Sequence, residues 1–235
     1  RWQTVYDLLD ENGQPILRET QTWTMREQGD AYILGLRGKG GAATDVTISE
    51  SDHGGLFLRM PWRDGINGRV FNSVRRADDR ANGQRAIWLD IGMQVEGRDN
   101  QAHVAIFDHA NNPGYPQPWS VDQELGVGPV RAQLGEWSIA KGETKTIEHQ
   151  LRVYTGELDD VSLTGAWYSY SGGRTASQSR LAIEEGRRAD FLTPEKAVES
   201  MTLQDGFTAQ VFASEPMITQ PMAFCWDDRG RLWVA

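Results

Sequence analysis

Short runs of β-branched and aromatic residues, each closed by turn-forming residues, constrain the fold of this chain more than any other feature. The runs VTISES, GLFLRM, RAIWLDIGM, HVAIFDH and TIEHQLRVYTG are bounded by Gly, Asn, Asp or Pro. None of them shows a sustained period of 3.6 residues. Many short strands at this spacing are typical of an antiparallel β-sandwich. The sequence therefore predicts an all-β domain over residues 1–157.

The amino-acid composition of the chain limits the kinds of partner that the protein is expected to bind. The 235 residues are 39% hydrophobic and include nine tryptophans, which is enough for a packed core. The formal net charge is −9, and the arginines are scattered among acidic residues. A nucleic-acid-binding protein would show a basic patch, so the sequence predicts no nucleic-acid partner. An acidic surface suits a neutral or cationic partner better, and a glycan is one such ligand.

Cysteine usage and apolar runs exclude several further features. Cys225 is the single cysteine, so no intrachain disulfide can form and no Cys-x-x-Cys metal or haem motif is present. Apolar runs such as AYIL are only a few residues long, so no transmembrane segment is predicted, and no signal peptide is visible. Arg1 leads directly into a strand-like run, and the last residues stop inside a hairpin pattern. We therefore expect the chain to be a fragment of a longer protein.

The chain changes character after residue 157. Residues 158–192 are small, polar and charged, which predicts a linker, with a short helix as one option at 179–187. Thr193 can then cap a short helix, and LQDGFTAQVFASEP reads as a turn and a strand. The run AFCWDDRGRLWVA predicts two strands about a tight turn, as a β-propeller blade often begins. Residues 193–235 are therefore predicted to be the start of a truncated propeller.

The stretch SDHGGLFLRMPW holds the first candidate site. His53 precedes two glycines, which let a ligand approach the backbone closely. A strand from His53 to Met60 would place His53, Phe57 and Arg59 on one face, where they could bind a sugar hydroxyl or carboxylate. The alternative is a Gly-Gly bulge, with His53 hydrogen-bonded locally and Arg59 on a solvated face. The residues leave both interpretations open.

A second Asp-His pair ends the strand-like run in AIFDHANNPGYPQPW. Neighbours on a strand point to opposite faces, so adjacency does not make Asp108 and His109 a relay. If the strand ends at Asp108, His109 joins a loop in which asparagines can bind hydroxyls and aromatic rings can stack on sugars. This loop is a candidate glycan subsite, formed by His109, Asn112, Tyr115 and Trp119. The alternative is a proline-rich crossover loop packed by its own aromatic residues.

The other two histidines are expected to be structural. His149 is in phase with the apolar residues of its strand, which predicts a core histidine with satisfied hydrogen bonds, and His103 also lies in the middle of a strand face. No His-x-His spacing occurs, and His103 and His109 would be about 20 Å apart on one strand. We therefore predict no metal site and no cofactor in this chain. Paired carboxylates, which glycoside hydrolysis requires, could come from Asp90, Glu96, Asp108 or Glu124.

Several motifs resemble, in the same order, the C-terminal half of the family catalogued as PmoA-like or DUF6807. They are DHGGLFLRM, RAIWLDIGM, VAIFDHANNPGYPQPW and a closing GELDD. The resemblance covers residues 1–157 and implies a bacterial β-sandwich that is often encoded near sugar-degrading enzymes. The N-terminal half of that family usually carries an Asp-His-Pro-His-His motif, and its absence here fits a truncated start. The family label also implies a methane-oxygenase-like function, which requires a metal.

The end of the chain carries a second resemblance. The stretch from GRRADFLTPEKAVESM to RGRLWVA is similar to the entry into the large membrane-associated dehydrogenase-type, haem-binding proteins of planctomycetes. The resemblance implies that a sugar-dehydrogenase-like propeller and a c-type cytochrome follow as downstream modules of the same chain. It also implies an exported or periplasmic protein. Cys225 matches no haem-binding position in that pattern.

Three hypotheses for the sandwich domain follow. The first is a carbohydrate-processing domain, the second a non-catalytic sugar-binding, spacer or interaction module, and the third, more remote, a methane-oxygenase-like protein. The residues do not decide whether the domain is an enzyme. The first hypothesis requires the candidate side chains to meet in one hollow. Those side chains are His53, Arg59 and His109 as catalytic groups, and Asn112, Tyr115 and Trp119 as substrate-binding groups.

Overall fold

A computed structural model describes residues 1–61, 66–171, 193–204, 206–213 and 224–234 of the chain. The chain divides into two compact units, residues 1–186 and 187–235, and each is described by itself. Within the described residues, no helix is both long enough and apolar enough to cross a membrane.

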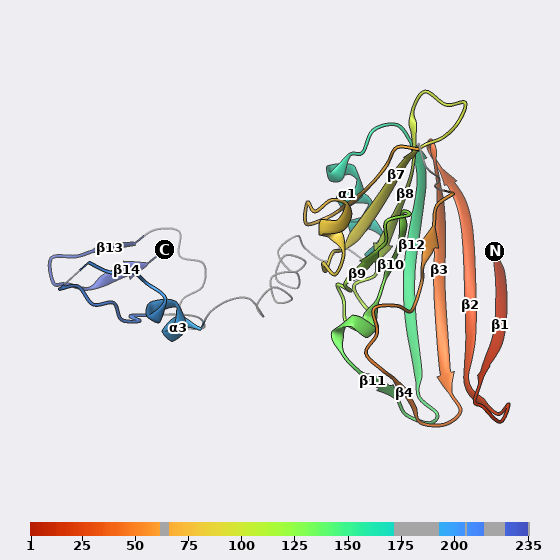
Figure 1. The fold of residues 1–235 in the computed structure, drawn as a ribbon, viewed down its shortest axis with the longest axis horizontal. Coiled ribbons are helices and arrows are strands. Elements are labelled where there is room, and N and C mark those ends of the chain that lie inside the picture. The colour runs from red at the N-terminus through yellow and green to blue at the C-terminus, as the bar shows by residue number, and fades with distance from the viewer. Residues whose placement is uncertain (62–65, 172–192, 205, 214–223, 235) are drawn as a thin grey trace. The chain divides into compact units, whose positions relative to one another are not determined.

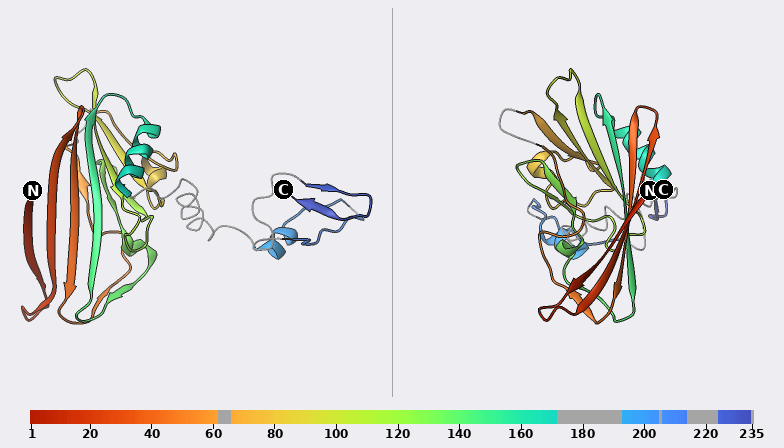
Figure 2. Two further views of the ribbon diagram at one scale, coloured as in Figure 1. Left: turned by 180° about the vertical axis from the view of Figure 1, so that it is seen from behind. Right: turned by 90° about the vertical axis from the view of Figure 1, so that its right-hand side faces the viewer.

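A seven-stranded antiparallel sheet forms the body of the first unit. The strand order is β1-β2-β3-β12-β8-β7-β6, and the long strands β1, β2, β3 and β12 lie side by side (Figure 1). The right-hand view of Figure 2 shows the twist that such a sheet normally has. The strands are β1 (Trp2–Leu9), β2 (Pro15–Gln28), β3 (Ala31–Ala42), β6 (Gly68–Asn72), β7 (Trp88–Gln94), β8 (Gln101–Asp108) and β12 (Thr144–Thr155).

Short strands form a second layer over one face of this sheet, which we call the inner face. Leu89, Ile91 and Ile106 project from the sheet and pack against Trp119 and Val127 of the second layer. The prediction of an all-β antiparallel sandwich is therefore confirmed. The second layer consists of the sheet β5-β10-β9 (Leu58–Arg59, Gly126–Pro129, Trp119–Val121), the pair β4-β11 (Val46–Ile48, Trp137–Ile139), and the 3-10 turns Asp78–Ala81 and Arg131–Leu134.

The helix α1 (Asp160–Ser171) packs on part of the opposite, outer face. Leu163 and Trp167 of this helix pack on Trp88 and Phe107 of the sheet. The Trp167 indole donates a hydrogen bond of 2.8 Å to the backbone carbonyl of Asp108. The sequence predicted a linker from residue 158, whereas α1 is part of the sandwich unit. Serine, threonine and glycine are interspersed among the large side chains of this helix, so its sequence shows no continuous apolar face.

The second unit begins as the sequence predicts. Thr193 caps α3 (Pro194–Glu199), and its hydroxyl accepts a bond of 3.3 Å from the backbone N–H of Lys196. The strands β13 (Phe224–Trp226) and β14 (Leu232–Val234) pair antiparallel about a turn held by the Asp227 carboxylate. No strand forms in the described residues 207–213, where one was expected, and the optional helix at 179–187 lies outside the described residues.

Candidate functional site

A groove of about 570 Å³ lies between the inner face of the sheet and the second layer. The sheet supplies its floor from β1, β2, β3 and β12, beyond the part that the core fills. Its roof comes from the segment 48–57 and from residues 129–139. We call this cavity the inner groove. It falls within the volume range of small-molecule sites in proteins.

The register between the strands determines which residues lie side by side on the floor of the inner groove. Trp23, Leu36, His149 and Asp108 form one row across β2, β3, β12 and β8, because each is the partner of the next. The next two rows contain a glycine on β3, which leaves the backbone bare between polar and apolar side chains. Those rows are Gln21, Gly38 and Ile147, and then Glu19, Gly40 and Lys145.

Hydrogen bonds fix the polar side of the floor. The Gln21 side-chain amide lies 2.6 Å from the Tyr6 hydroxyl and donates to Glu19 at 2.8 Å. Partial burial and the neighbouring Glu19 raise the pKa of Tyr6 to about 12, so its hydroxyl stays protonated. Trp2 stacks on Trp23 with ring centroids 5.9 Å apart. The floor therefore presents an ordered amide and a phenol beside an aromatic pair.

The roof carries aromatic and cationic groups. The Trp137 ring lies 5.5 Å beneath the Arg131 guanidinium, which also donates to the backbone carbonyl of Gly135 at 3.1 Å. Phe57 and His53 complete this side, and both are exposed. Aromatic faces and hydrogen-bonding groups thus line both the floor and the roof.

His53 lies in the inner groove, but on a loop. β5 begins only at Leu58, so of the two interpretations left open by the sequence, the continuous strand from His53 to Met60 does not form. Gly54 and Gly55 have φ values of 135° and 82°, which an extended strand does not allow and glycine readily adopts. The backbone N–H of His53 donates to the Ser51 hydroxyl at 3.1 Å. The bulge-like alternative describes this segment, while the side chain of His53 still borders the groove.

Arg59 does not line the groove. Its guanidinium binds Asp122 at 3.0 Å and Glu124 at 2.7 Å, and it lies over the Phe57 ring. More than half of the arginine side chain is exposed. Arg59 therefore belongs to a solvated charge cluster, as the alternative interpretation proposed.

His109 lies on the outer side of the sheet end, away from the groove lining. Its Nδ1 accepts a bond of 3.2 Å from the backbone N–H of Asn111 and lies 4.0 Å from Glu148. Its ring makes an edge contact with Tyr170 of α1, with centroids 5.1 Å apart. The structure therefore does not bring His53, Arg59 and His109 together in one hollow.

The loop after Asp108 is packed by its own residues and their neighbours. Tyr115 stacks on Trp167 at 6.2 Å, under α1. Trp119 is fully buried in the inner core and donates to the carbonyl of Ala86 at 2.9 Å, so neither of its faces is exposed. Asn112 is buried and bridges Asp108 to the backbone of Glu148. The structure thus does not assemble these three residues into one subsite.

A buried network on the outer face accounts for His103. Its Nδ1 lies 2.8 Å from Asp90, its Nε2 lies 3.0 Å from the carbonyl of Gly156, and Tyr154 donates to the same carboxylate at 2.8 Å. Both ring nitrogens face acceptors, so the protonated imidazolium satisfies both. Burial alone would lower the pKa of His103, but Asp90 outweighs it and the pKa is raised. The prediction that His103 is structural agrees with this geometry.

A second buried pair, Asp108 and His149, closes one end of the inner groove. The His149 Nδ1 lies 3.8 Å from Asp108 Oδ1 and has no hydrogen-bond partner among the described residues. His149 is thus buried as predicted, but it is not satisfied. The Asp108 carboxylate accepts bonds from the Asn112 amide at 2.7 Å and from the backbone N–H of Gln117 at 2.8 Å.

Burial dominates the ionisation of this pair. It raises the pKa of Asp108 to about 7 against the hydrogen bonds that it accepts, and it lowers the pKa of His149 to about 4. Between these values both groups are neutral, so the end of the groove carries hydrogen-bonding capacity without charge. As strand alternation predicted, the adjacent His109 is not the partner of Asp108. The partner is instead the histidine directly across the strand pair.

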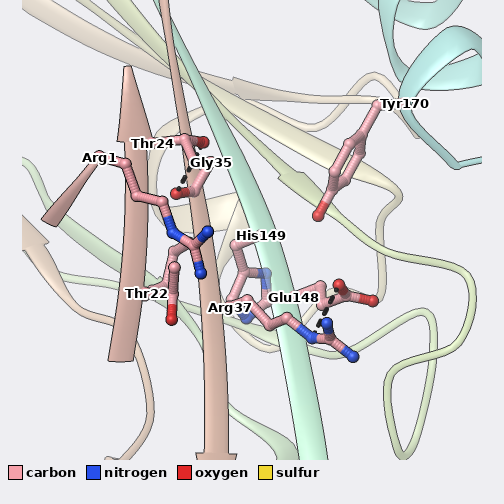
Figure 3. Close-up of a pocket in the computed structure, with 9 residues that line it drawn as sticks. Arg1, Thr22, Thr24, Gly35, Arg37, Glu148, His149 and Tyr170 are labelled. Atoms are coloured by element: carbon pink, nitrogen blue, oxygen red, sulfur yellow. Dashed lines mark hydrogen bonds and ion pairs between the residues drawn. The ribbon is translucent and has the colours of Figure 1, made fainter. Parts of the chain in front are cut away.

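His149 and Leu36 also border a second cavity of about 300 Å³, which is lined by Gly35 and by Thr22, Thr24 and Arg37 of β2 and β3. Figure 3 shows the Tyr170 hydroxyl directed into this cavity, opposite an ion pair of 3.5 Å between Arg37 and Glu148. The Tyr170 hydroxyl is buried and has no partner among the described residues. We call this cavity the outer pocket. Unsatisfied polar atoms thus line both sides of the sheet around His149.

The other carboxylates that sequence singled out are engaged or distant. Asp90 belongs to the His103 network, Glu124 binds Arg59, and Glu96 is exposed in a loop. In the described part of the chain, no group of three or more His, Cys, Asp or Glu side chains is arranged to hold a metal ion. Asp108 is therefore the one carboxylate of this set that adjoins the inner groove.

Comparison with known proteins gives families without assigned functions. The model of a domain of unknown function, DUF7133, matches residues 193–235. No curated protein and no solved structure matches the chain. The model of a family of unknown function, DUF6807, matches residues 1–168 and therefore ends inside α1, in keeping with the place of that helix in the sandwich. Since this match spans most of the sequence, the chain belongs to the DUF6807 family.

Proposed function

We propose that the sandwich unit binds a neutral carbohydrate in the inner groove. The observation that carries this proposal is the composition of the lining, where the aromatic rings of Trp23 and Trp137 accompany the Gln21 amide, the Tyr6 hydroxyl and His149. Aromatic faces bury the C–H surfaces of a sugar, and amide or hydroxyl groups bond its hydroxyls. The missing side chain at Gly38 leaves room for a ligand on the floor, since a Cβ there would meet no atom nearer than 3.8 Å.

The charges of the groove favour a neutral ligand. Lys145 is paired with Glu143, so its ammonium is compensated. Arg131 and Glu19 then contribute one charge of each sign to the lining. A groove that selected an acidic or basic ligand would concentrate one sign of charge. A sugar, whose hydroxyls both donate and accept, matches the mixed lining better.

The wider setting is part of the same proposal. The likeness of the last residues to membrane-associated dehydrogenase-type proteins supports an exported protein in which this groove precedes a sugar-dehydrogenase-like propeller and a c-type cytochrome. The groove would then capture or process the carbohydrate on which such modules act. A spacer without ligand is the alternative, and it predicts no sugar binding at all.

The floor of the groove offers a direct test. Valine at Gly38 projects into the groove, and a Cβ there has only ordinary contacts, with Glu19 and Ile147 both 3.8 Å away. We expect Gly38→Val to abolish binding of neutral cello-, xylo-, manno- and malto-oligosaccharides, measured by calorimetry on the full chain. Gly41→Val is the matched control, because Gly41 is on the same strand and faces the other way. Equal affinities in the two variants, or no binding by the parent chain, would refute the proposal.

A further inference from the structure

Two buried His–Asp pairs lie in the same sheet, and their geometry differs. In the pair of His103 and Asp90, the atoms are 2.8 Å apart and both ring nitrogens are bonded. In the pair of His149 and Asp108, the separation is 3.8 Å and Nδ1 has no partner among the described residues. Only 2% of His149 is exposed, so its Nδ1 has lost contact with water and has gained no hydrogen bond in return. A buried polar atom without a hydrogen bond lowers the stability of the fold, so its presence points to a role other than packing.

The position of His149 suggests that role. The residue is on the inner face in phase with Ile147 and Lys145, and all three line the inner groove. Beyond it lie Asp108 and Gln117, which are buried and fixed by short hydrogen bonds. His149 is therefore the polar side chain where the groove ends, and it is held against a rigid polar wall.

We infer that His149 forms a hydrogen bond with a ligand hydroxyl at the closed end of the inner groove. This inference rests on the proposed function and adds the contact that would anchor the sugar. A hydroxyl both donates and accepts, so it can bond to the neutral imidazole in either tautomer. A ligand carboxylate would add a second acidic group beside Asp108, and an ammonium could bond only to an unprotonated nitrogen. The chemistry of this corner therefore selects a hydroxyl.

The test separates binding from stability. His149→Phe replaces an unsatisfied ring by an apolar ring of similar shape, so the melting temperature should stay unchanged or rise. Measurement at pH 6 keeps Asp108 protonated, so the substitution leaves no unpaired charge at this position. We expect affinity for the oligosaccharide that the parent chain binds best to fall by about tenfold or more. His149→Gln keeps a hydrogen-bonding group and should retain part of the affinity.

His103→Phe is the matched control for stability. It removes one of the two side chains that bond the buried Asp90 carboxylate and should lower the melting temperature strongly. If His149→Phe destabilises the chain as much, the second pair is a structural contact and the inference fails. If His149→Phe is stable and binds with unchanged affinity, the inference fails while the groove keeps its proposed function. If no oligosaccharide binds the parent chain, the proposed function and this inference both fail.

Discussion

At the residue scale, protonation of buried histidines links stability to pH. His103 has a raised pKa in the folded state because its bond to Asp90 outweighs burial. The folded chain therefore keeps this proton at pH values where an unfolded histidine, with a pKa of about 6.5, has lost it. The stabilising contribution is complete below that value and disappears as pH rises through the folded pKa.

This linkage gives a testable pH dependence. The free energy of unfolding, measured by urea denaturation from pH 6 to pH 9, is expected to fall with rising pH. His103→Gln removes the titrating group and should flatten the fall. A parent chain whose stability is constant over this range would show that His103 is not a buried cation.

The pair of Asp108 and His149 contributes little to that slope. In the folded state Asp108 holds one proton up to about pH 7, and His149 releases its own above about pH 4. In the unfolded chain the histidine carries the proton instead, up to about 6.5, while the aspartate is ionised. The two states thus bind the same number of protons over most of this range. His149→Phe breaks the balance, and its stability is expected to fall as pH rises from 4 to 7.

At the element scale, α1 depends on two side chains. Trp167 is fully buried on the outer face and also bonds the carbonyl of Asp108. Trp167→Ala is expected to lower the free energy of unfolding by about 3–5 kcal/mol, because it leaves a cavity and an unpaired carbonyl. Val161→Ala on the exposed side of the same helix should change it by less than about 0.5 kcal/mol. Similar urea midpoints for the two variants would contradict the docking of α1.

The boundaries of strands and helices could be predicted from the sequence where turn residues or a capping residue determine them. Turn residues and strand-forming runs predicted the sandwich, and Thr193 with its following proline predicted the start of α3. The helix α1 was missed because its sequence, DVSLTGAWYSYS, mixes aromatic and aliphatic residues with serine, threonine and glycine, without a clear apolar face at helical spacing. Packing on a sheet overrides weak propensity, and that packing is not visible in the local sequence.

At the scale of the whole molecule, the candidate site could be predicted only in part. His53 borders the inner groove, and the glycines that follow this histidine were the local signal that singled it out. The row that joins Trp23, Leu36, His149 and Asp108 depends on register between distant strands, which sequence alone does not fix. Trp119 illustrates the same limit, since an aromatic residue in a polar loop turned out to fill the core. His149 and Asp108 each lie in phase with apolar residues of their strands, and this was the one sequence signal that pointed to a buried polar pair.

The central claim is that the inner groove binds a sugar, and indole N–H resonances report it most directly. Trp23 and Trp137 line the groove, whereas Trp119 and Trp167 are buried elsewhere. Titration of the ¹⁵N-labelled full chain with the neutral oligosaccharides should shift the first two indole signals saturably and leave the other two in place. The absence of any saturable shift at Trp23 and Trp137 would contradict the account.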